Sequence, residues 1–227
     1  MKLFLSPFKP VIYLAAFTVL LLAAPLGRFV FGDGHDWTLQ AGGALAVLFA
    51  LGAAKWPALN QLGASFTRWM NSAALTAVVC ALALGIPTAA SSIYNQKLMP
   101  YYQGYDLFLF TNGADVPWMT TTGEPYVVEY AGQDARSMAL TVLLHVVFFL
   151  VAAVAGLALG LAYSRYGTGP AFVGALATGV VAVLVYWQSS KVGDQWYSAA
   201  GAGVTAACLV ALIVSAVVIS RTKSFVP

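Results

Sequence analysis

Two strongly polar ionisable side chains fall within long apolar runs of the sequence. His145 lies well inside one run, and Arg28 lies near the end of the first run. An ionisable group inside a membrane is a candidate functional residue, because placing it there is costly. His145 could titrate or bind a metal, but a neutral histidine can also satisfy a hydrogen bond between helices. We favour a structural role, since haem and metal sites need further ligands.

The apolar runs contain no Asp and no Glu. Proton-coupled and sodium-coupled carriers usually place carboxylates in the middle of the membrane, although backbone carbonyls can also bind sodium. If this chain moves a solute, we therefore expect the energy to come from a partner such as an ATPase, or the movement to be passive.

The other polar residues that could act in catalysis or bind a metal do not indicate an enzyme. Asp33, His35 and Asp36 could touch a divalent metal, but a glycine-rich turn followed by a helix N-terminal carboxylate explains them better. The sequence holds no P-loop and none of the HExxH, CxxC or GxSxG motifs. We predict no catalytic residues, no cofactor and no metal site.

Composition indicates an integral membrane protein. Of the 227 residues, 60% are hydrophobic and only 8% are charged, whereas a soluble domain carries about 25% charged residues. Most of the surface must therefore face lipid. The net charge of +3 is small and does not indicate nucleic-acid binding.

The hydropathy pattern predicts an all-α fold with six transmembrane helices. Each apolar run is close to the length of about 20 residues that crosses the hydrocarbon core. The runs are Val11–Phe31, Leu39–Ala54, Ser72–Ser92, Met138–Tyr163, Pro170–Gln188 and Ser198–Ser220.

Charge predicts the orientation. With both termini in the cytoplasm, the cytoplasmic segments hold seven basic residues and no acid, while every Asp and Glu lies on the other side. Retention of Lys and Arg in short cytoplasmic loops determines orientation. We therefore predict a multi-pass protein of the plasma (cytoplasmic or inner) membrane with both ends inside.

Three units follow from these boundaries. Residues 1–94 form a first three-helix half, residues 95–136 form an extracytoplasmic loop of about 40 residues, and residues 137–227 form a second three-helix half. An inverted repeat would fit two odd-numbered halves, but the halves show no residue-level similarity.

The cytoplasmic segment Lys55–Asn71 has an amphipathic helix pattern. Large apolar residues recur at steps of three and four, with Gly63 as a weak point. Such a helix could lie in the headgroup layer or dock a cytoplasmic ATPase. The predicted partner-binding residues are Trp56, Leu59, Phe66, Arg68 and Trp69.

The outer loop is rich in aromatic residues and contains turn signals. Asp106–Thr111 and Tyr126–Tyr130 are interpreted as short strands of a small cap. The aromatic side chains could form the core of a self-packed lid, or a contact surface for a partner or an apolar ligand. The predicted contact residues are Tyr101, Tyr105, Phe108, Trp118 and Tyr126.

Gly156 and Gly160 form a GxxxG pair in the fourth run. Small residues allow two helix backbones to approach closely in lipid. The pair predicts a site of helix packing rather than a specific activity.

Together these features predict a membrane-embedded, permease-type transport subunit of a multi-subunit complex, with other membrane subunits or a cytoplasmic ATPase as partners. The topology is similar to that of small six-helix ABC-transporter permeases, although no family motif supports the resemblance. The very short first outer loop and the large middle loop depart from that plan. The alternative is a non-transporting structural or assembly subunit of a larger membrane complex.

Overall fold

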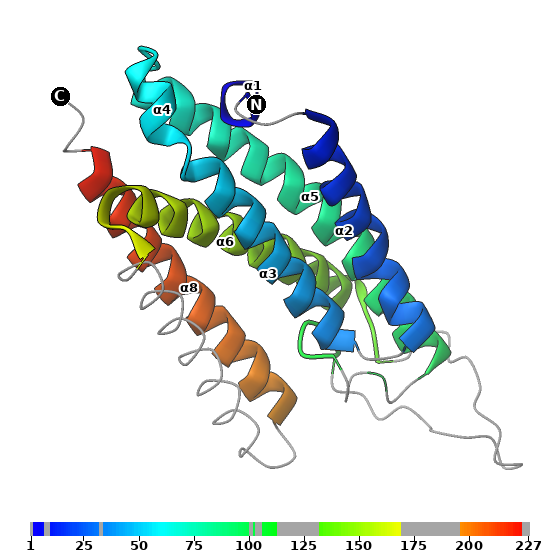
Figure 1. The fold of residues 1–227 in the computed structure, drawn as a ribbon. Coiled ribbons are helices and arrows are strands. Elements are labelled where there is room, and N and C mark those ends of the chain that lie inside the picture. Colours follow the sequence, from blue (N-terminus) through cyan, green and yellow to red (C-terminus); the bar gives the residue numbers. More distant parts are fainter. Residues whose placement is uncertain are drawn as a thin grey trace, which may run out of the picture.

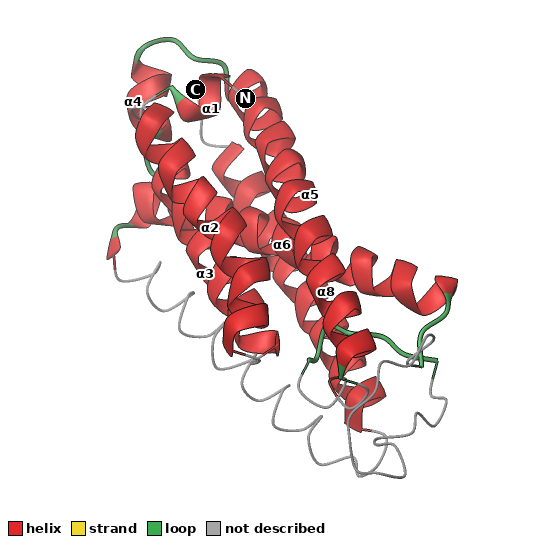
Figure 2. Ribbon diagram, turned by 90° about the vertical axis from the view of Figure 1, so that its right-hand side faces the viewer, coloured by secondary structure: helices red, strands yellow, loops and turns green. Residues whose placement is uncertain are grey.

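The computed structural model describes residues 2–6, 10–31, 34–99, 102, 106–112, 132–168 and 196–223. In this part of the chain all the regular secondary structure is helical, and Figure 2 shows no strand there. The helices are α1 (Lys2–Leu5), α2 (Pro10–Phe31), α3 (Gly34–Ala53), α4 (Trp56–Gln61), α5 (Phe66–Leu98), α6 (Ala135–Tyr166) and α8 (Trp196–Lys223).

Four segments of the described chain are long and apolar enough to cross a membrane. They are Val11–Arg28, His35–Gln61, Phe66–Leu98 and Ala135–Tyr166, and α8 adds a shorter apolar stretch at Ala206–Arg221. The chain is thus an all-helical protein compatible with several membrane crossings. The fifth predicted span, Pro170–Gln188, lies outside the described residues, and the count of six stays a prediction.

The helices form an elongated bundle with α3, α5 and α6 at its centre (Figure 1). Helix α2 packs on α3 and α5, and α8 packs on α6. Helices α1 and α4 lie at one end of the bundle, which we call the α4 end. Residues 106–112 and the first turns of α3 and α6 lie at the opposite end, which we call the loop end.

Helices α6 and α8 run in the same direction. The Arg165 guanidinium, near the end of α6, donates a hydrogen bond to the Arg221 carbonyl, near the end of α8, at 3.0 Å. Both C-terminal ends therefore lie toward the α4 end of the bundle (Figure 1). A topology of six spans requires this parallel course for its fourth and sixth spans.

The closest helix contact joins α3 and α6 through Gly156 and Gly160. A Cβ atom added to Gly156 would lie 2.1 Å from the Ala46 carbonyl oxygen, and one on Gly160 would lie 2.2 Å from that of Ala50. Any larger residue would push the two backbones apart. The GxxxG pair of α6 therefore packs against a row of alanines in α3, as small residues do between membrane helices.

The α4 end of the bundle contains an aromatic cluster that we define as Phe4, Phe49, Trp56, Phe66 and Trp69. Neighbouring rings in it have centroids 5.0–6.0 Å apart. Phe4 brings the short helix α1 into the bundle, and its backbone N–H donates to the Ser72 hydroxyl at 3.1 Å. The five side chains are buried and bury each other.

The structure corrects the prediction of one amphipathic helix over Lys55–Asn71. Helix α4 has only six residues, and Phe66 begins α5. Between them Gly63 has a φ of 80°, a left-handed conformation that glycine adopts readily. The Ala64 N–H bonds to Leu59 O and the Gly63 N–H to Asn60 O, which is the hydrogen-bond pattern of a Schellman motif.

The predicted strand Asp106–Thr111 is also wrong, because residues 106–112 form an irregular segment with a turn. The segment instead packs on α6. The Phe110 N–H donates to the Thr141 hydroxyl at 3.0 Å, and the Phe108 ring lies 4.8 Å from that of Phe148. The second predicted strand, Tyr126–Tyr130, lies outside the described residues.

A buried polar cluster as the candidate functional site

A cluster of polar side chains lies at the loop end of the bundle, where four helices and the 106–112 segment meet. We define it as Arg28 from α2, Thr38 from α3, Ser92 from α5, His145 from α6 and Asp106 from the segment. These five residues are 0–2% exposed to solvent. At a rise of 1.5 Å per residue, His145 lies about 15 Å along α6 from its first residue.

The Arg28 guanidinium is the centre of the cluster. Its Nη1 group donates to the Ser92 hydroxyl and to Asp106 Oδ2, and its Nη2 group donates to the Thr38 hydroxyl. Nη2 also lies 3.2 Å from His145 Nε2. Arginine carries five N–H donors in a planar fork, so one residue joins α2 to every other element of the cluster.

The hydrogen bonds of His145 define its tautomer. Its Nδ1 atom lies 2.8 Å from the Thr141 carbonyl oxygen, which can only accept, so Nδ1 carries a hydrogen. Nε2 faces the Arg28 Nη2 group, which can only donate, so Nε2 offers its lone pair. His145 is therefore a neutral acceptor held between α6 and Arg28, and its structural role stays a prediction.

Asp106 is the carboxylate that balances the charge of Arg28. Its Oδ1 atom accepts a hydrogen bond from the Phe108 N–H at 3.0 Å. Burial raises the pKa of this carboxyl, but the Arg28 guanidinium, with smaller contributions from neighbouring donors, holds the pKa below its ordinary value of 3.8. The side chain is thus an ionised carboxylate at neutral pH.

The position of Asp106 overturns one premise drawn from the sequence. The apolar runs hold no carboxylate, but the loop supplies one to the interior of the bundle. A buried ion pair is weak evidence for stability, because removing two charges from water costs nearly as much as their attraction returns. Loss of either partner is nevertheless strongly destabilising, since it leaves an unpaired buried charge.

Two donors of this region have no hydrogen-bond partner among the described residues. They are Nε of Arg28 and the hydroxyl of Tyr102. Tyr102 is 2% exposed and lies close to Asp106, with Arg28 and Asn95 within weak hydrogen-bonding reach of its hydroxyl. Buried polar groups are nearly always hydrogen-bonded to protein or to ordered water, so each of these two donors can still bond to a further acceptor.

The predicted partner-binding residues take different positions. Trp56, Phe66 and Trp69 are buried in the aromatic cluster, so the chain itself covers them. Leu59 is half-buried, and Arg68 is exposed on the first turn of α5. Binding of a partner by this region stays a prediction. Of the five predicted residues, only Arg68 and part of Leu59 are accessible to a partner in this conformation.

Of the five predicted contact residues in the outer loop, the structure describes Phe108. It is fully buried, with its ring 5.4 Å from that of His145. It therefore packs the loop onto the polar cluster and offers no external surface. Tyr101, Tyr105, Trp118 and Tyr126 lie outside the described residues.

The first loop holds one pair of possible metal ligands in the described chain. His35 Nε2 lies 3.3 Å from Asp36 Oδ1, in the first turn of α3, and both side chains are partly exposed. The third member of the predicted trio, Asp33, is outside the described residues. The described part contains no group of three or more His, Cys, Asp or Glu side chains able to hold a metal ion.

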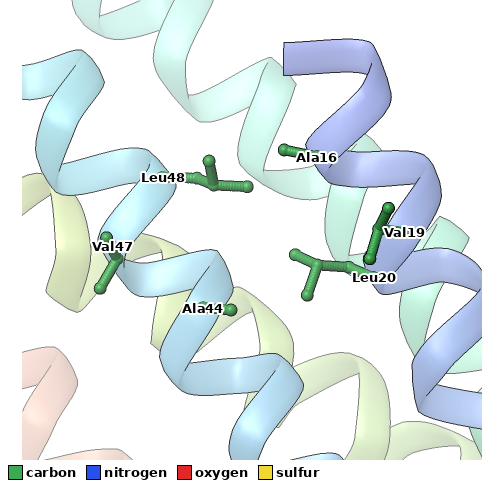
Figure 3. A pocket seen from close by; sticks show the side chains of 6 residues that line it. All are labelled: Ala16, Val19, Leu20, Ala44, Val47 and Leu48. Carbon is green, nitrogen blue, oxygen red and sulfur yellow. The ribbon is translucent and has the colours of Figure 1, made fainter. Parts of the chain in front are cut away.

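An apolar groove lies between α2 and α3 on the outside of the bundle. Its volume is about 510 Å³, and it opens widely to the surroundings. Figure 3 shows side chains from both helices directed into it. The lining residues are Ala16, Val19 and Leu20 of α2 and Ala44, Val47 and Leu48 of α3.

Sequence reasoning found Arg28 and His145 but missed Asp106, Thr38 and Ser92. Asp106 did carry a signal, because the four residues after it, Leu107–Phe110, are all apolar. A run of that kind in an outer loop indicates burial, and its leading carboxylate is then drawn inside. Thr38 and Ser92 carried none, since single hydroxyl residues are common in membrane helices.

The chain matches no known protein family, and comparisons with curated proteins and with solved structures find no similar protein. Its class is therefore defined by the fold and the cluster alone: an all-helical protein with several potential membrane spans and a buried ionic cluster.

Proposed function

We propose that the chain is a membrane-embedded, permease-type transport subunit of a multi-subunit complex. In this proposal it lies in the plasma membrane with both ends in the cytoplasm, so the loop end faces outward. A separate ATPase is the expected source of energy. The sequence argument for an ATPase was the absence of a buried carboxylate, and Asp106 removes that argument because it lies inside the bundle. The expectation of an ATPase partner is now supported by the predicted topology alone.

The observation that carries this proposal is the Arg28 cluster. Ionisable groups within membrane bundles are costly, and they mark the paths of substrates and ions. Here the ion pair joins α2 to a loop segment, with α3, α5 and α6 around it. Such a junction can hold the outer ends of the helices together in one state and release them in another.

The test is purification in a mild detergent, with identification of the proteins that copurify. We expect an ATPase among them, and its hydrolysis rate is then measured in nanodiscs with Arg28→Lys. Lysine keeps the charge but lacks the planar fork, so the rate should fall while the complex remains intact. Arg136→Lys is the matched control, since Arg136 is exposed at the start of α6.

A non-transporting assembly subunit is the alternative, and the groove between α2 and α3 favours it. The groove is lined by small and aliphatic residues, which suit a transmembrane helix of another subunit. Ala16→Trp fills the groove and should then release a membrane partner. Leu14→Trp is the control, because Leu14 is exposed on α2 outside the groove.

These experiments separate the two functions. Loss of a membrane partner with Ala16→Trp, without any copurifying ATPase, supports the assembly subunit. A copurifying ATPase whose rate depends on Arg28 supports the permease. A complex with neither dependence contradicts the use of either site.

A further inference from the structure

The helices of the polar cluster, taken without the loop, form a site that requires an anion. Arg28 supplies one positive charge, Thr38 and Ser92 supply hydroxyls, and His145 is neutral. A single buried charge without a counter-ion is strongly destabilising. The site therefore needs one negative charge, which Asp106 provides in this structure.

Asp106 fills that need incompletely. Only its Oδ2 atom bonds to Arg28, while its Oδ1 atom bonds to the backbone of its own segment at Phe108. A carboxylate that pairs with arginine through two parallel bonds is held more strongly. The Nε–H edge of Arg28 has no acceptor among the described residues, so it can form such a second bond.

The Tyr102 hydroxyl lies in the same region. It is buried close to Asp106 and is within weak hydrogen-bonding reach of Arg28 and Asn95, but it has no acceptor in full hydrogen-bonding geometry among the described residues. A ligand with two acceptor oxygens would satisfy more donors than Asp106 does. A monoanion fits the charge, whereas a phosphate dianion would leave one negative charge buried and unpaired.

We propose that the ends of α2, α3, α5 and α6 form a binding pocket for a small carboxylate solute, with Asp106 as a tethered substitute for that ligand. The external carboxylate displaces the Asp106 side chain and bonds to the Arg28 guanidinium. This inference deepens the proposed function by naming a substrate class, and it rests on that function for its role in transport. Its tests measure binding alone, so its failure is distinguishable from failure of the transport proposal.

The first test is chemical rescue of the full chain in detergent with Asp106→Ala. We expect the variant to have a lower Tm, and sodium formate or acetate to restore at least half of the loss, saturating with concentration. Sodium chloride at equal ionic strength should not. The double variant Arg28→Met with Asp106→Ala should not respond to formate, because it has no charge to pair.

Equal effects of formate and chloride on Asp106→Ala would overturn the proposal, and so would an equal response of the double variant. Asp134→Ala is the matched control for loss of a carboxylate. Asp134 is exposed and caps α6 through the Ser137 N–H, so formate should leave the Tm of that variant unchanged.

A second test retains Asp106 and does not depend on folding of the first variant. In a Cys80→Ala, Cys208→Ala background, Leu109→Cys reports on the segment, since Leu109 is 8% exposed. A tethered group competes at an effective concentration in the millimolar range, so acetate is used at about 10–100 mM. Acetate should speed thiol labelling of Leu109→Cys severalfold.

Asn112→Cys is the control for this test, because Asn112 is already exposed. Its labelling rate should not change with acetate. An unchanged rate at Leu109→Cys, or an equal rise at both positions, would contradict displacement of Asp106 by an external carboxylate.

Discussion

The two ends of the bundle are held together by different physical means. At the α4 end, five aromatic side chains bury each other through ring contacts. At the loop end, one arginine is hydrogen-bonded to four side chains from three helices and a loop. The stabilisation from aromatic packing grows with the buried apolar area and depends only weakly on direction. The stability of the polar cluster depends on the pairing of every donor and acceptor in it.

This difference predicts different tolerance to change. Truncating an aromatic ring removes contacts in proportion to its size, and neighbouring rings can shift to fill part of the space. Removing one member of the polar cluster leaves its buried partners unsatisfied. The loop end should therefore respond in an all-or-none manner and the α4 end in a graded one.

The largest effect on stability is expected at the contact between α3 and α6, which lies between the two ends of the bundle. Gly160→Leu should lose several kcal/mol of stability, because its side chain would meet the Ala50 carbonyl of α3. Gly43→Leu is the control, since a Cβ there meets nothing within 4 Å. The folded fraction is measured by size-exclusion chromatography after heating, and equal survival of both variants would contradict the α3–α6 contact.

At the loop end, Arg28→Met should cost about 3–5 kcal/mol, because it leaves Asp106 buried and unpaired. Adding Asp106→Leu to it should recover most of that loss, since the double variant buries no charge. Chemical denaturation in detergent measures the three stabilities. Additive losses in the double variant would show that the two residues do not act as a pair.

At the α4 end, Trp69→Phe should cost on the order of 1–2 kcal/mol and Trp69→Ala about 3–5 kcal/mol. The indole N–H of Trp69 has no hydrogen-bond partner in the described chain, so phenylalanine loses packing alone. The same denaturation assay gives both values. A Phe variant as unstable as the Ala variant would mean that the cluster is not graded.

The smallest effect concerns pH. Asp106 has a lowered pKa in the folded protein, so its contribution is present above the unfolded value of 3.8 and is lost as pH falls through the lower folded value. The Tm difference between the wild type and Asp106→Asn should therefore stay constant from about pH 5 to pH 8. A difference that disappears near pH 6 would show that Asp106 is not held ionised by Arg28.

The helices could be predicted because their signal is local. Each apolar run is close to the length that crosses a membrane, and the structure extends α5 and α6 beyond the runs at both ends. The error at Lys55–Asn71 has a simple cause. Residues spaced by three and four also point to one side when a tight turn at Gly63 replaces part of the helix, so periodicity did not reveal the break.

The polar cluster was only half predictable because its signal is not local. Arg28 and Asp106 are separated by 78 positions, and Arg28 and His145 by 117. No spacing rule connects residues so far apart, whereas a charged residue within an apolar run can be recognised individually. The missing information was that the 106–112 segment is buried. The sequence indicates this burial only weakly, through four consecutive apolar residues in the segment.

The separation between Arg28 and Asp106 also has a consequence in time. A ribosome adds about 5–20 residues per second, so the 78 positions between them correspond to roughly 4–16 s of synthesis. During that interval α2 holds an arginine without its carboxylate. Arg28 is in the last turn of α2, where a long side chain can extend to the headgroups. As the first candidate membrane span, α2 is therefore expected to lie in a shallower position until the 106–112 segment has been synthesised, and to take its final depth only then.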